Sequence, residues 1–562
     1  MVNQFKGGIA MKRRKILCVA LALTMAFGTL AGCSTPGGGG GTQSSAQSGT
    51  AAKGEKVFRF SINGNPPTMD PKKANSMYTA DMTYHLFDGL MRNNCGKVEP
   101  AVAESYDVSD DGLTYTFHLR SDAKWSDGKT VTAEDCVYGF QRLVDPATAA
   151  PGAYLGEVVK NGKEVTAGKV PVKDLGVSAP DDKTVVVVLA TPAPYFPTML
   201  SGAAFVPCRK DLVEKYGKDF AATPDKNVYN GPYQLTEWAQ DNKLVLTKNE
   251  NYWDKDKVKL DKVEISVLTD PNTPIGMYET GKLDYVIVPT SAVDQYRDQA
   301  KLYYDGGMSY MQINLKSGNA ALANKDFRKA LSYGLSRKDL NTMGSAGVPD
   351  PTSRLVLPVL PGPTSTFGKD YPFDPYPAAG DTAKAKEYLQ KAMSALGVSS
   401  PSDLTFKVSY AEGEGTRKIM EILQAEWKKN LGINITLDPV PYAVLYENQA
   451  AEKFEMMYTG WVPDYDDPVS YLELFQTGAG YNYSQYSNAD YDKYLEAVKT
   501  EKDVKKRMDH LFAAEKVVCD DLPIIVLNAS RKMALWDDNR IKNFKQYHVG
   551  NSYTFIYTDI VS

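Results

Sequence analysis

Residues 404–437 read LTFKVSYAEGEGTRKIMEILQAEWKKNLGINITL. The first part, 404–410 (LTFKVSY), predicts a strand, and 417–430 predict a helix that stops at Gly432. A second strand is predicted over 433–437 (INITL). A strand, a helix and a strand joined by short links form a βαβ unit, which has two parallel strands and a right-handed crossover. This stretch therefore predicts an α/β fold.

The chain beyond this unit predicts where a ligand would bind. A helical pattern over 442–452 precedes an apolar strand over 454–460, and the strand breaks into Trp461-Val462-Pro463-Asp464-Tyr465. Open α/β sheets bind ligands outside the carboxyl ends of their strands. Trp461 and Asp464 are thus the first candidates for a binding site.

Upstream segments also alternate between strand and helix patterns. The β-branched run 184–189 (TVVVVL) predicts a buried strand, and 115–119 and 243–248 alternate as half-buried strands do. Thr132 is a helix N-cap with acidic residues in the first turn behind it, and Asp145-Pro146 ends that helix.

The N-terminus carries an export pattern. Four cations at 12–15 precede an apolar run over 16–27, which predicts a signal peptide over residues 1–32. The sequence Leu30-Ala31-Gly32-Cys33 resembles a bacterial lipobox, in which the cysteine becomes a lipidated N-terminus. Residues 33–56 would then hold the lipidated Cys33 and a flexible Gly/Ser-rich linker. Whether Met1 or Met11 starts translation is open.

Length, composition and charge limit the function classes. The 562 residues are 43% hydrophobic and 23% charged, as in a globular protein of more than one domain. Residues 1–32 hold five basic and no acidic side chains, which leaves 59 basic against 68 acidic residues and a net charge of −9 in the rest. Nucleic acid is therefore not an expected partner, because binding phosphates needs a basic face.

Catalytic and metal-binding patterns are missing from the sequence. Neither HExxH nor GxSxG occurs, so we expect no enzyme activity and no cofactor. The acidic run 464–467 lacks the glycine and glutamate of a calcium loop. Cysteines in the body of the chain show no CxxC spacing, which argues against zinc and favours buried free thiols, with one or two disulfides left open; they are Cys95, Cys136, Cys208 and Cys519.

Aromatic residues are abundant, at 11% of the chain with 35 tyrosines. Two interpretations stay open: core packing with an exposed interface, or an aromatic-walled cleft for an extended ligand. The cluster in question is Tyr442, Tyr446, Tyr458, Trp461, Tyr465 and Tyr471.

Several segments, in order along nearly the whole body, resemble the extracellular solute-binding proteins of peptide ABC importers, family 5, of the oligopeptide-binding type. These segments are 69–71 (MDP), 86–90 (LFDGL), 100–105 (PAVAES), 115–135 (YTFHLRSDAKWSDGKTVTAED), 230–233 (NGPY), 251–253 (NYW), 327–331 (FRKAL) and 460–465 (GWVPDY).

The resemblance implies a two-lobed α/β fold of the periplasmic-binding-protein type (class II), with an extra domain and a ligand cleft between the lobes. It implies a domain I built from 57–87, 210–306 and 532–562. Domain II, the extra domain, would span 88–209, and domain III, the second lobe, 307–531. A peptide would lie extended between the lobes, paired through its backbone like an added strand.

The resemblance also implies site residues. Asp464 stands where family members hold the peptide α-ammonium, and Trp461 would form part of the cleft wall. Backbone groups would come from Gly460 and Val462, and from Asn75, Ser76 and Met77. Some members meet the peptide carboxylate with cations, but the aligned positions here hold Tyr458, Gln449 and Thr416, with Arg417 the only cation nearby. Either the carboxylate stays in solvent or another residue meets it.

Together these features predict a receptor anchored by Cys33 at the extracytoplasmic face of the cell membrane. It would act as a monomer, deliver oligopeptides to ABC permease subunits with their ATPases, and catalyse no reaction. The alternatives are the same fold with a nickel chelate, haem, a sugar or an opine as cargo, and a peptide-sensing lipoprotein.

Overall fold

The computed structural model describes residues 54–549 and 552–561, which belong to one compact unit. The expected signal peptide over 1–32, the lipidation site Cys33 and nearly all of the linker 33–56 lie outside these residues. Within the described part of the chain, no helix is long and apolar enough to cross a membrane.

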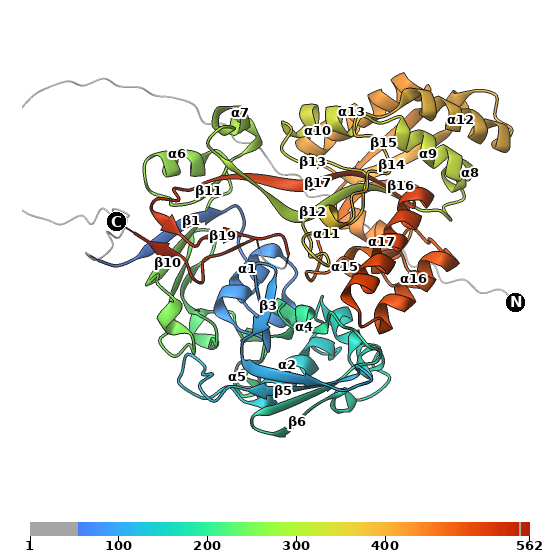
Figure 1. The fold of residues 1–562 in the computed structure, drawn as a ribbon. Coiled ribbons are helices and arrows are strands. Elements are labelled where there is room, and N and C mark those ends of the chain that lie inside the picture. The colour runs from blue at the N-terminus through green and yellow to red at the C-terminus, as the bar shows by residue number, and fades with distance from the viewer. Residues whose placement is uncertain (1–53, 550–551, 562) are drawn as a thin grey trace, which may run out of the picture. The chain divides into compact units, whose positions relative to one another are not determined.

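The largest sheet has seven strands and contains the predicted βαβ unit (Figure 1). Strand β14 (Thr405–Ala411) pairs in parallel with β15 (Asn434–Val440), and α13 (Glu414–Leu431) connects them, so the prediction is confirmed. β14 also pairs in parallel with β16 (Met456–Trp461). The order is completed by β12 (Lys301–Ile313), β17 (Ile524–Leu535) and β11 (Val286–Ile287), with β13 (Asp350–Pro351) paired to β17.

Helix α13 forms because its apolar residues fall on one face. Met420, Leu423, Trp427 and Leu431 are buried at helical spacing, and the indole of Trp427 donates a 2.9 Å hydrogen bond to Leu331 O. Gly432 ends the helix with φ of 75°, a conformation that glycine adopts without strain.

Two further sheets have four strands each. One has the order β1 (Val57–Ile62), β10 (Lys262–Val267), β9 (Lys243–Lys248) and β8 (Tyr233–Ala239). The other is antiparallel throughout, in the order β4 (Ala103–Val108), β5 (Thr114–Leu119), β7 (Thr184–Val188) and β6 (Val177–Asp181).

The strand predicted over 184–189 is present as β7, but it is buried on one face only. In β7 only Val185 and Val187 are buried, and the residues between them are partly exposed. The antiparallel sheet is covered on one face only, by α2 (Ala133–Val144) among others, whereas a run of β-branched residues cannot reveal which face is covered. The predicted cap of α2 is confirmed, because Thr132 and Asp135 form a capping box.

The remaining elements complete the fold. The helices are α1 (Met77–Leu86), α3 (Gly162–Thr166), α4 (Phe196–Met199), α5 (Lys210–Tyr216), α6 (Thr273–Glu279), α7 (Val293–Tyr296), α8 (Ala320–Ala323), α9 (Lys325–Tyr333), α10 (Arg337–Ser345), α11 (Phe367–Asp370), α12 (Thr382–Leu396), α14 (Tyr442–Ala450), α15 (Val469–Leu472), α16 (Ala489–Thr500) and α17 (Val504–Asp521). Short strand pairs are β2 (Met91–Asn94) with β3 (Lys97–Pro100), β18 (Ile541–Lys542) with β21 (Asp559–Ile560), and β19 (Lys545–Gln546) with β20 (Tyr553–Thr554).

Two long strands, β12 and β17, run side by side through the molecule (Figure 1). The expected domain boundaries at 306/307 and 531/532 fall inside them. Their pairing shifts register between Tyr304 and Met308, where Gly306 has φ of +86°. A Cβ on Gly306 would lie 1.9 Å from His548 O, so this position requires glycine.

Free thiols are found at all four body cysteines. Cys136, Cys208 and Cys519 are buried and Cys95 is partly exposed. Among the described residues, no group of three or more His, Cys, Asp or Glu is arranged to hold a metal ion.

Candidate functional site

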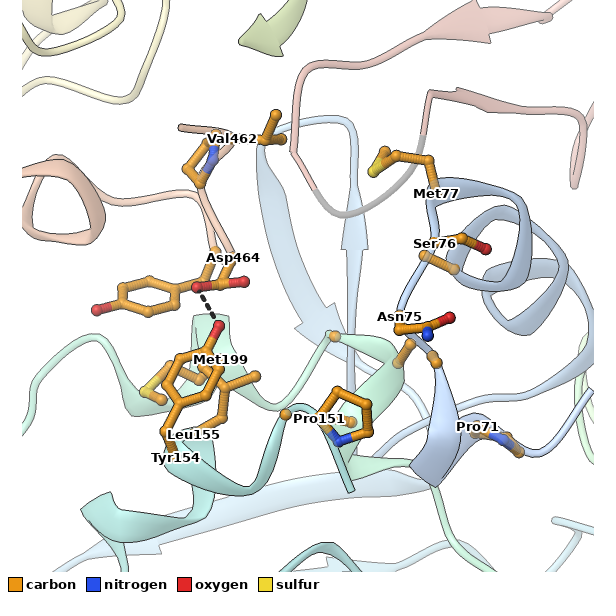
Figure 2. Close-up of a pocket in the computed structure, with 18 of the residues that line it drawn as sticks. Pro71, Asn75, Ser76, Met77, Pro151, Tyr154, Leu155, Met199, Val462 and Asp464 are labelled. Atoms are coloured by element: carbon orange, nitrogen blue, oxygen red, sulfur yellow. Dashed lines mark hydrogen bonds between the residues drawn. The ribbon is translucent and has the colours of Figure 1, made fainter. Parts of the chain in front are cut away.

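A cavity of about 690 Å³ lies beyond the carboxyl end of β16. Three parts of the chain line it: the segment around α1, residues of the sequence range 143–205, and the segments that follow β15 and β16. Figure 2 shows Val462 and Asp464 on one side, Asn75, Ser76 and Met77 on the other, and Tyr154, Leu155 and Met199 below them. The structure thus brings together Asn75, Ser76, Met77, Gly460, Trp461, Val462 and Asp464.

Strand β16 fixes the position of the acidic residue. Gly460 pairs with Ser309 of β12, and a Cβ on Gly460 would lie 2.6 Å from Met308 O, so the strands approach closely there. After the strand ends, the main-chain N–H of Asp464 donates a 3.1 Å hydrogen bond to Ser470 Oγ. These contacts hold the Asp464 carboxylate at the edge of the cavity.

In the described part of the chain, the Asp464 carboxylate has one side-chain hydrogen-bond partner. Tyr154 Oη donates a 2.7 Å hydrogen bond to Asp464 Oδ2 (Figure 2). Burial raises the pKa of Asp464 to about 6, and the Tyr154 hydrogen bond acts in the opposite direction by stabilising the charged form. Burial and the neighbouring Asp464 together raise the pKa of Tyr154, so the phenol stays protonated and remains a donor.

No described lysine, arginine or histidine lies within 4.0 Å of the Asp464 carboxylate. Lys72 is the one cation among the described residues that line the cavity. Its Nζ donates hydrogen bonds of 2.6 and 2.7 Å to the carbonyls of Ala204 and Val206, and burial lowers its pKa to about 7. Lys72 is therefore already engaged, and the cavity presents a carboxylate that has no counter-ion among the described residues.

A second buried acid, Glu473, interacts electrostatically with Asp464. Glu473 accepts a 2.7 Å hydrogen bond from Tyr465 Oη, and burial, with a contribution from Asp464, raises the pKa of Glu473 to about 7. Asp467, by contrast, is neutralised by Arg507 through two hydrogen bonds of 2.7 and 2.9 Å. The charge of Asp467 is thus balanced by Arg507, whereas the Asp464 carboxylate has no cation within 4.0 Å among the described residues.

Aromatic side chains form much of the cavity wall. Tyr442 is 67% exposed and Tyr446 41%, which is unusual for such large side chains. From the predicted aromatic cluster, Tyr442, Tyr446, Trp461 and Tyr465 line the cavity. Tyr471 does not, because it is fully buried and its hydroxyl donates to Gly306 O at 2.7 Å.

Two expected site residues do not line the cavity. Tyr458 lies on β16 but packs against the hydrophobic core that contains Met311 and Trp427. Arg417 is exposed near the start of α13 and forms no ion pair with another described residue. Gln449 lines an adjoining cavity of about 110 Å³ and donates a 2.6 Å hydrogen bond to Gln312 Oε1.

The sequence did not point to several of the cavity residues, among them Tyr154 and Tyr481. Their rings lie 4.9 Å apart in an edge-to-face arrangement, and Tyr481 also lies 5.5 Å from Trp461. Tyr154 comes from a short 3₁₀ helix, Ala153–Val158, and no sequence pattern links it to Asp464.

Comparisons with known proteins identify the family of the chain. The family model of the bacterial extracellular solute-binding proteins, family 5 Middle, matches residues 97–483. The dipeptide-binding protein DppE of Bacillus subtilis (strain 168) is 32% identical over 549 residues, covering 96% of this chain and 98% of that protein.

Solved structures share the fold. The substrate-binding domain of an oligopeptide ABC transporter from Bacillus anthracis str. Ames has a TM-score of 0.75 and 30% identity, covering 91% of this chain and 99% of that one. Listeria monocytogenes OppA bound to peptide has a TM-score of 0.74 and 31% identity, covering 91% and 100%. These likenesses confirm the predicted α/β fold of the periplasmic-binding-protein type. The chain belongs to the bacterial extracellular solute-binding proteins, family 5.

Proposed function

We propose that this protein binds oligopeptides in the cavity and delivers them to the permease of an ABC importer. The observation that carries the proposal is the Asp464 carboxylate, which faces the cavity with a tyrosine hydroxyl as its side-chain partner and, within residues 54–549 and 552–561, no counter-cation. The relatives support a peptide cargo, since one is named a dipeptide-binding protein and another was solved with a bound peptide.

The α-ammonium of a peptide is the group that Asp464 would take. An ammonium removed from water needs a counter-charge, and a charge-assisted hydrogen bond to a carboxylate supplies it. Asp464 in turn loses the penalty of being a buried, unpaired charge. Main-chain groups of Gly460, Val462 and residues 75–77 would pair with the backbone of the extended ligand.

The C-terminal carboxylate of the bound peptide would meet no cation among the described residues of the cavity. Lys72 is engaged with two carbonyls, while Arg417 and Tyr458 lie outside the cavity. We therefore expect peptides whose carboxylate reaches solvent, and weak selection by length.

Transport would use the closing of two lobes around the ligand. The proposed lobes are domain I (57–87, 210–306 and 532–562) with domain II (88–209), and domain III (307–531). β12 and β17 would connect them as the hinge, with the register shift at Gly306 absorbing the change in backbone angles.

The proposed anchor is a lipid on Cys33, at the extracytoplasmic face of the membrane. Substituting Cys33→Ser should move the protein from the membrane fraction to the soluble fraction, whereas Cys95→Ser should not. Co-purification with permease subunits would test the transport partnership. The proposal includes no catalytic step and no cofactor.

Native mass spectrometry of residues 54–562, purified without denaturation, tests the cargo. A ladder of peptide masses is the expected result. A broad spread of peptide lengths would agree with a peptide carboxylate that the protein does not bind. A single non-peptide mass would overturn the peptide assignment and favour an alternative cargo. Protein that elutes empty is then titrated with free-amine peptides, and failure to bind them would also overturn it.

A further inference from the structure

A second hollow, of about 380 Å³, lies apart from the peptide cavity and shares no lining residue with it. We call it the cationic hollow. Its lining comes from the β2–β3 hairpin, the residue after β5, the loop after β9 and the C-terminal segment. The residues are Arg92, Lys97, Glu99, Pro100, Arg120, Trp253, Asp254, Lys257 and Tyr557.

Arg120 is the central group of the cationic hollow. Its guanidinium lies 3.5 Å from the centroid of the Trp253 ring, and its Nε donates a 2.6 Å hydrogen bond to Ala101 O. Nη1 is 3.7 Å from the exposed carboxylate of Asp122, which is beyond hydrogen-bond distance. Neither terminal nitrogen donates a hydrogen bond to another described residue, so a fixed, planar pair of donors is left for a ligand.

The walls around Arg120 are rigidly built. Arg92 is 5% exposed and bonds to Asp88 and to the hydroxyls of Tyr252 and Tyr557. The Trp253 indole donates a 2.9 Å hydrogen bond to Asp88, which holds the ring on which Arg120 stacks. The stacked geometry is therefore preorganised, and little side-chain entropy would be lost when a ligand binds.

The charge of the cationic hollow is opposite to that of the body. Four cations and two acids line it, in a protein whose residues 33–562 carry a net charge of −9. Glu99 and Asp254 lie 3.4 and 3.1 Å from Lys97 and Lys257, so the two acids are matched by the two lysines. Arg92 is neutralised by the buried Asp88, so the positive charge left in the hollow is that of Arg120, whose nearest carboxylate is the exposed Asp122 at 3.7 Å.

The geometry points to a binding site for a phosphate-type oxyanion in the cationic hollow, with Arg120 as the bidentate donor. A guanidinium fork matches the oxygens of such an anion, and the exposed side chains of Lys97 and Lys257 lie at the same hollow and add positive charge. The anion could be free phosphate or the phosphate of a lipid headgroup. A lipid headgroup is considered because the hollow is connected to the start of the described chain. Tyr557 lines the hollow, and Asp559, two residues later, pairs at 2.5 Å with Lys56. The proposed lipidation site, Cys33, precedes Lys56 in the sequence.

Calorimetry of the full chain with inorganic phosphate tests the first source. We expect saturable binding of one phosphate with a dissociation constant below about 1 mM. Arg120→Met should weaken it at least tenfold. Arg297→Met removes the same charge from an exposed arginine outside the hollow and should leave the affinity unchanged.

Vesicle sedimentation tests the second source, in a Cys33→Ser background so that a lipid on that residue cannot contribute. Phosphatidylglycerol vesicles should bind more than phosphatidylcholine vesicles, and Arg120→Met should abolish the difference. Either positive result supports the site and identifies the source. The inference is overturned if neither probe binds, or if Arg297→Met weakens binding as much as Arg120→Met.

Two further measurements show whether the Arg120→Met variant is folded and whether the two sites are separate. Peptide binding by Arg120→Met should be unchanged, which shows that the variant is folded and separates this site from the peptide cavity. If Arg120→Met does not fold, Lys257→Gln changes an exposed side chain and should still weaken phosphate binding measurably. An unchanged phosphate affinity in Lys257→Gln would then count against the site.

Discussion

Tyr154 and Asp464 are 310 residues apart in sequence, and a 2.7 Å hydrogen bond joins the phenol of one to the carboxylate of the other. The phenol comes from a short 3₁₀ helix and the carboxylate from the loop after β16. This bond is the side-chain hydrogen bond of the Asp464 carboxylate among the described residues. It orients Asp464 toward the cavity and stabilises its charged form.

Removing the phenol hydroxyl should make Asp464 a weaker acid. Tyr154→Phe deletes a hydrogen bond to the charged form, so the pKa of Asp464 should rise above its present value of about 6. Carboxyl-carbon NMR of the ligand-free protein measures this pKa. Tyr446→Phe, which removes a hydroxyl from another cavity tyrosine that has no hydrogen bond to Asp464 or Tyr154 among the described contacts, is the control. An unchanged pKa in Tyr154→Phe would contradict the assigned role.

Peptide affinity should fall as the pH drops through 6. The Asp464 pKa of about 6 in the free protein means that protonation competes with the ammonium below that pH, and a bound ammonium lowers the pKa. Affinity should be full near pH 7.5 and about tenfold weaker at pH 5, since each unit below the free pKa costs up to a factor of ten. Calorimetry from pH 5 to 8 measures it.

The pH profile needs a control because Glu473, with a pKa raised to about 7, lies nearby. In Asp464→Asn the low-pH loss should disappear. If Glu473→Gln removes the loss and Asp464→Asn does not, the titrating group has been assigned to the wrong residue.

A methyl group at Gly306 should destabilise the fold strongly. The backbone φ of +86° strains any other residue, and the added Cβ would lie 1.9 Å from His548 O. Gly306→Ala should lower the free energy of unfolding by about 2–4 kcal/mol, the sum of strain and displacement. Gly318, with φ of +89° and open space around it, is the matched control for strain alone. Urea denaturation measures the stability of both variants. Equal losses in Gly306→Ala and Gly318→Ala would show that the contact with His548 O is unimportant.

Truncating the Glu515 side chain should destabilise the protein, because its carboxylate pairs with Arg354 in the core. The carboxylate is fully buried, accepts hydrogen bonds of 2.7 and 3.2 Å from Arg354, and accepts one of 2.8 Å from Val356 N. Glu515→Ala leaves the Arg354 charge unpaired and should cost about 3–5 kcal/mol of unfolding free energy. Glu387→Ala, which breaks the exposed pair with Lys391, should change stability little. Thermal denaturation that ranks the two alike would refute this expectation.

Local patterns in the sequence were enough to find some elements. The β14–α13–β15 unit follows from residues within one short stretch, because apolar spacing, a terminal glycine and β-branched strands are local signals. The same signals placed Trp461 and Asp464 at a strand end. They could not show which face of β7 is covered, since burial depends on segments far away in the chain.

The partners of Asp464 could not be predicted in this way. Tyr154 has no periodic or motif signal that links it to a loop 310 residues later. The placement of Arg417 and Tyr458 also depended on tertiary structure: alignment puts both near the ligand, but the first is exposed on α13 and the second faces the core. Contacts between segments far apart in the chain decide such positions, and local patterns in a single sequence do not predict these contacts.

The central claim is that Asp464 holds the ammonium of a peptide, and calorimetry of Asp464→Asn tests it most directly. The variant keeps the shape and the Tyr154 contact but loses the charge. Affinity for a free-amine peptide should fall by roughly 3–5 kcal/mol, as for removing one partner of a buried charge pair. The N-acetylated form of that peptide should bind the unmodified protein weakly and the variant equally weakly. A loss smaller than tenfold, about 1.4 kcal/mol, for the free-amine peptide would contradict the account.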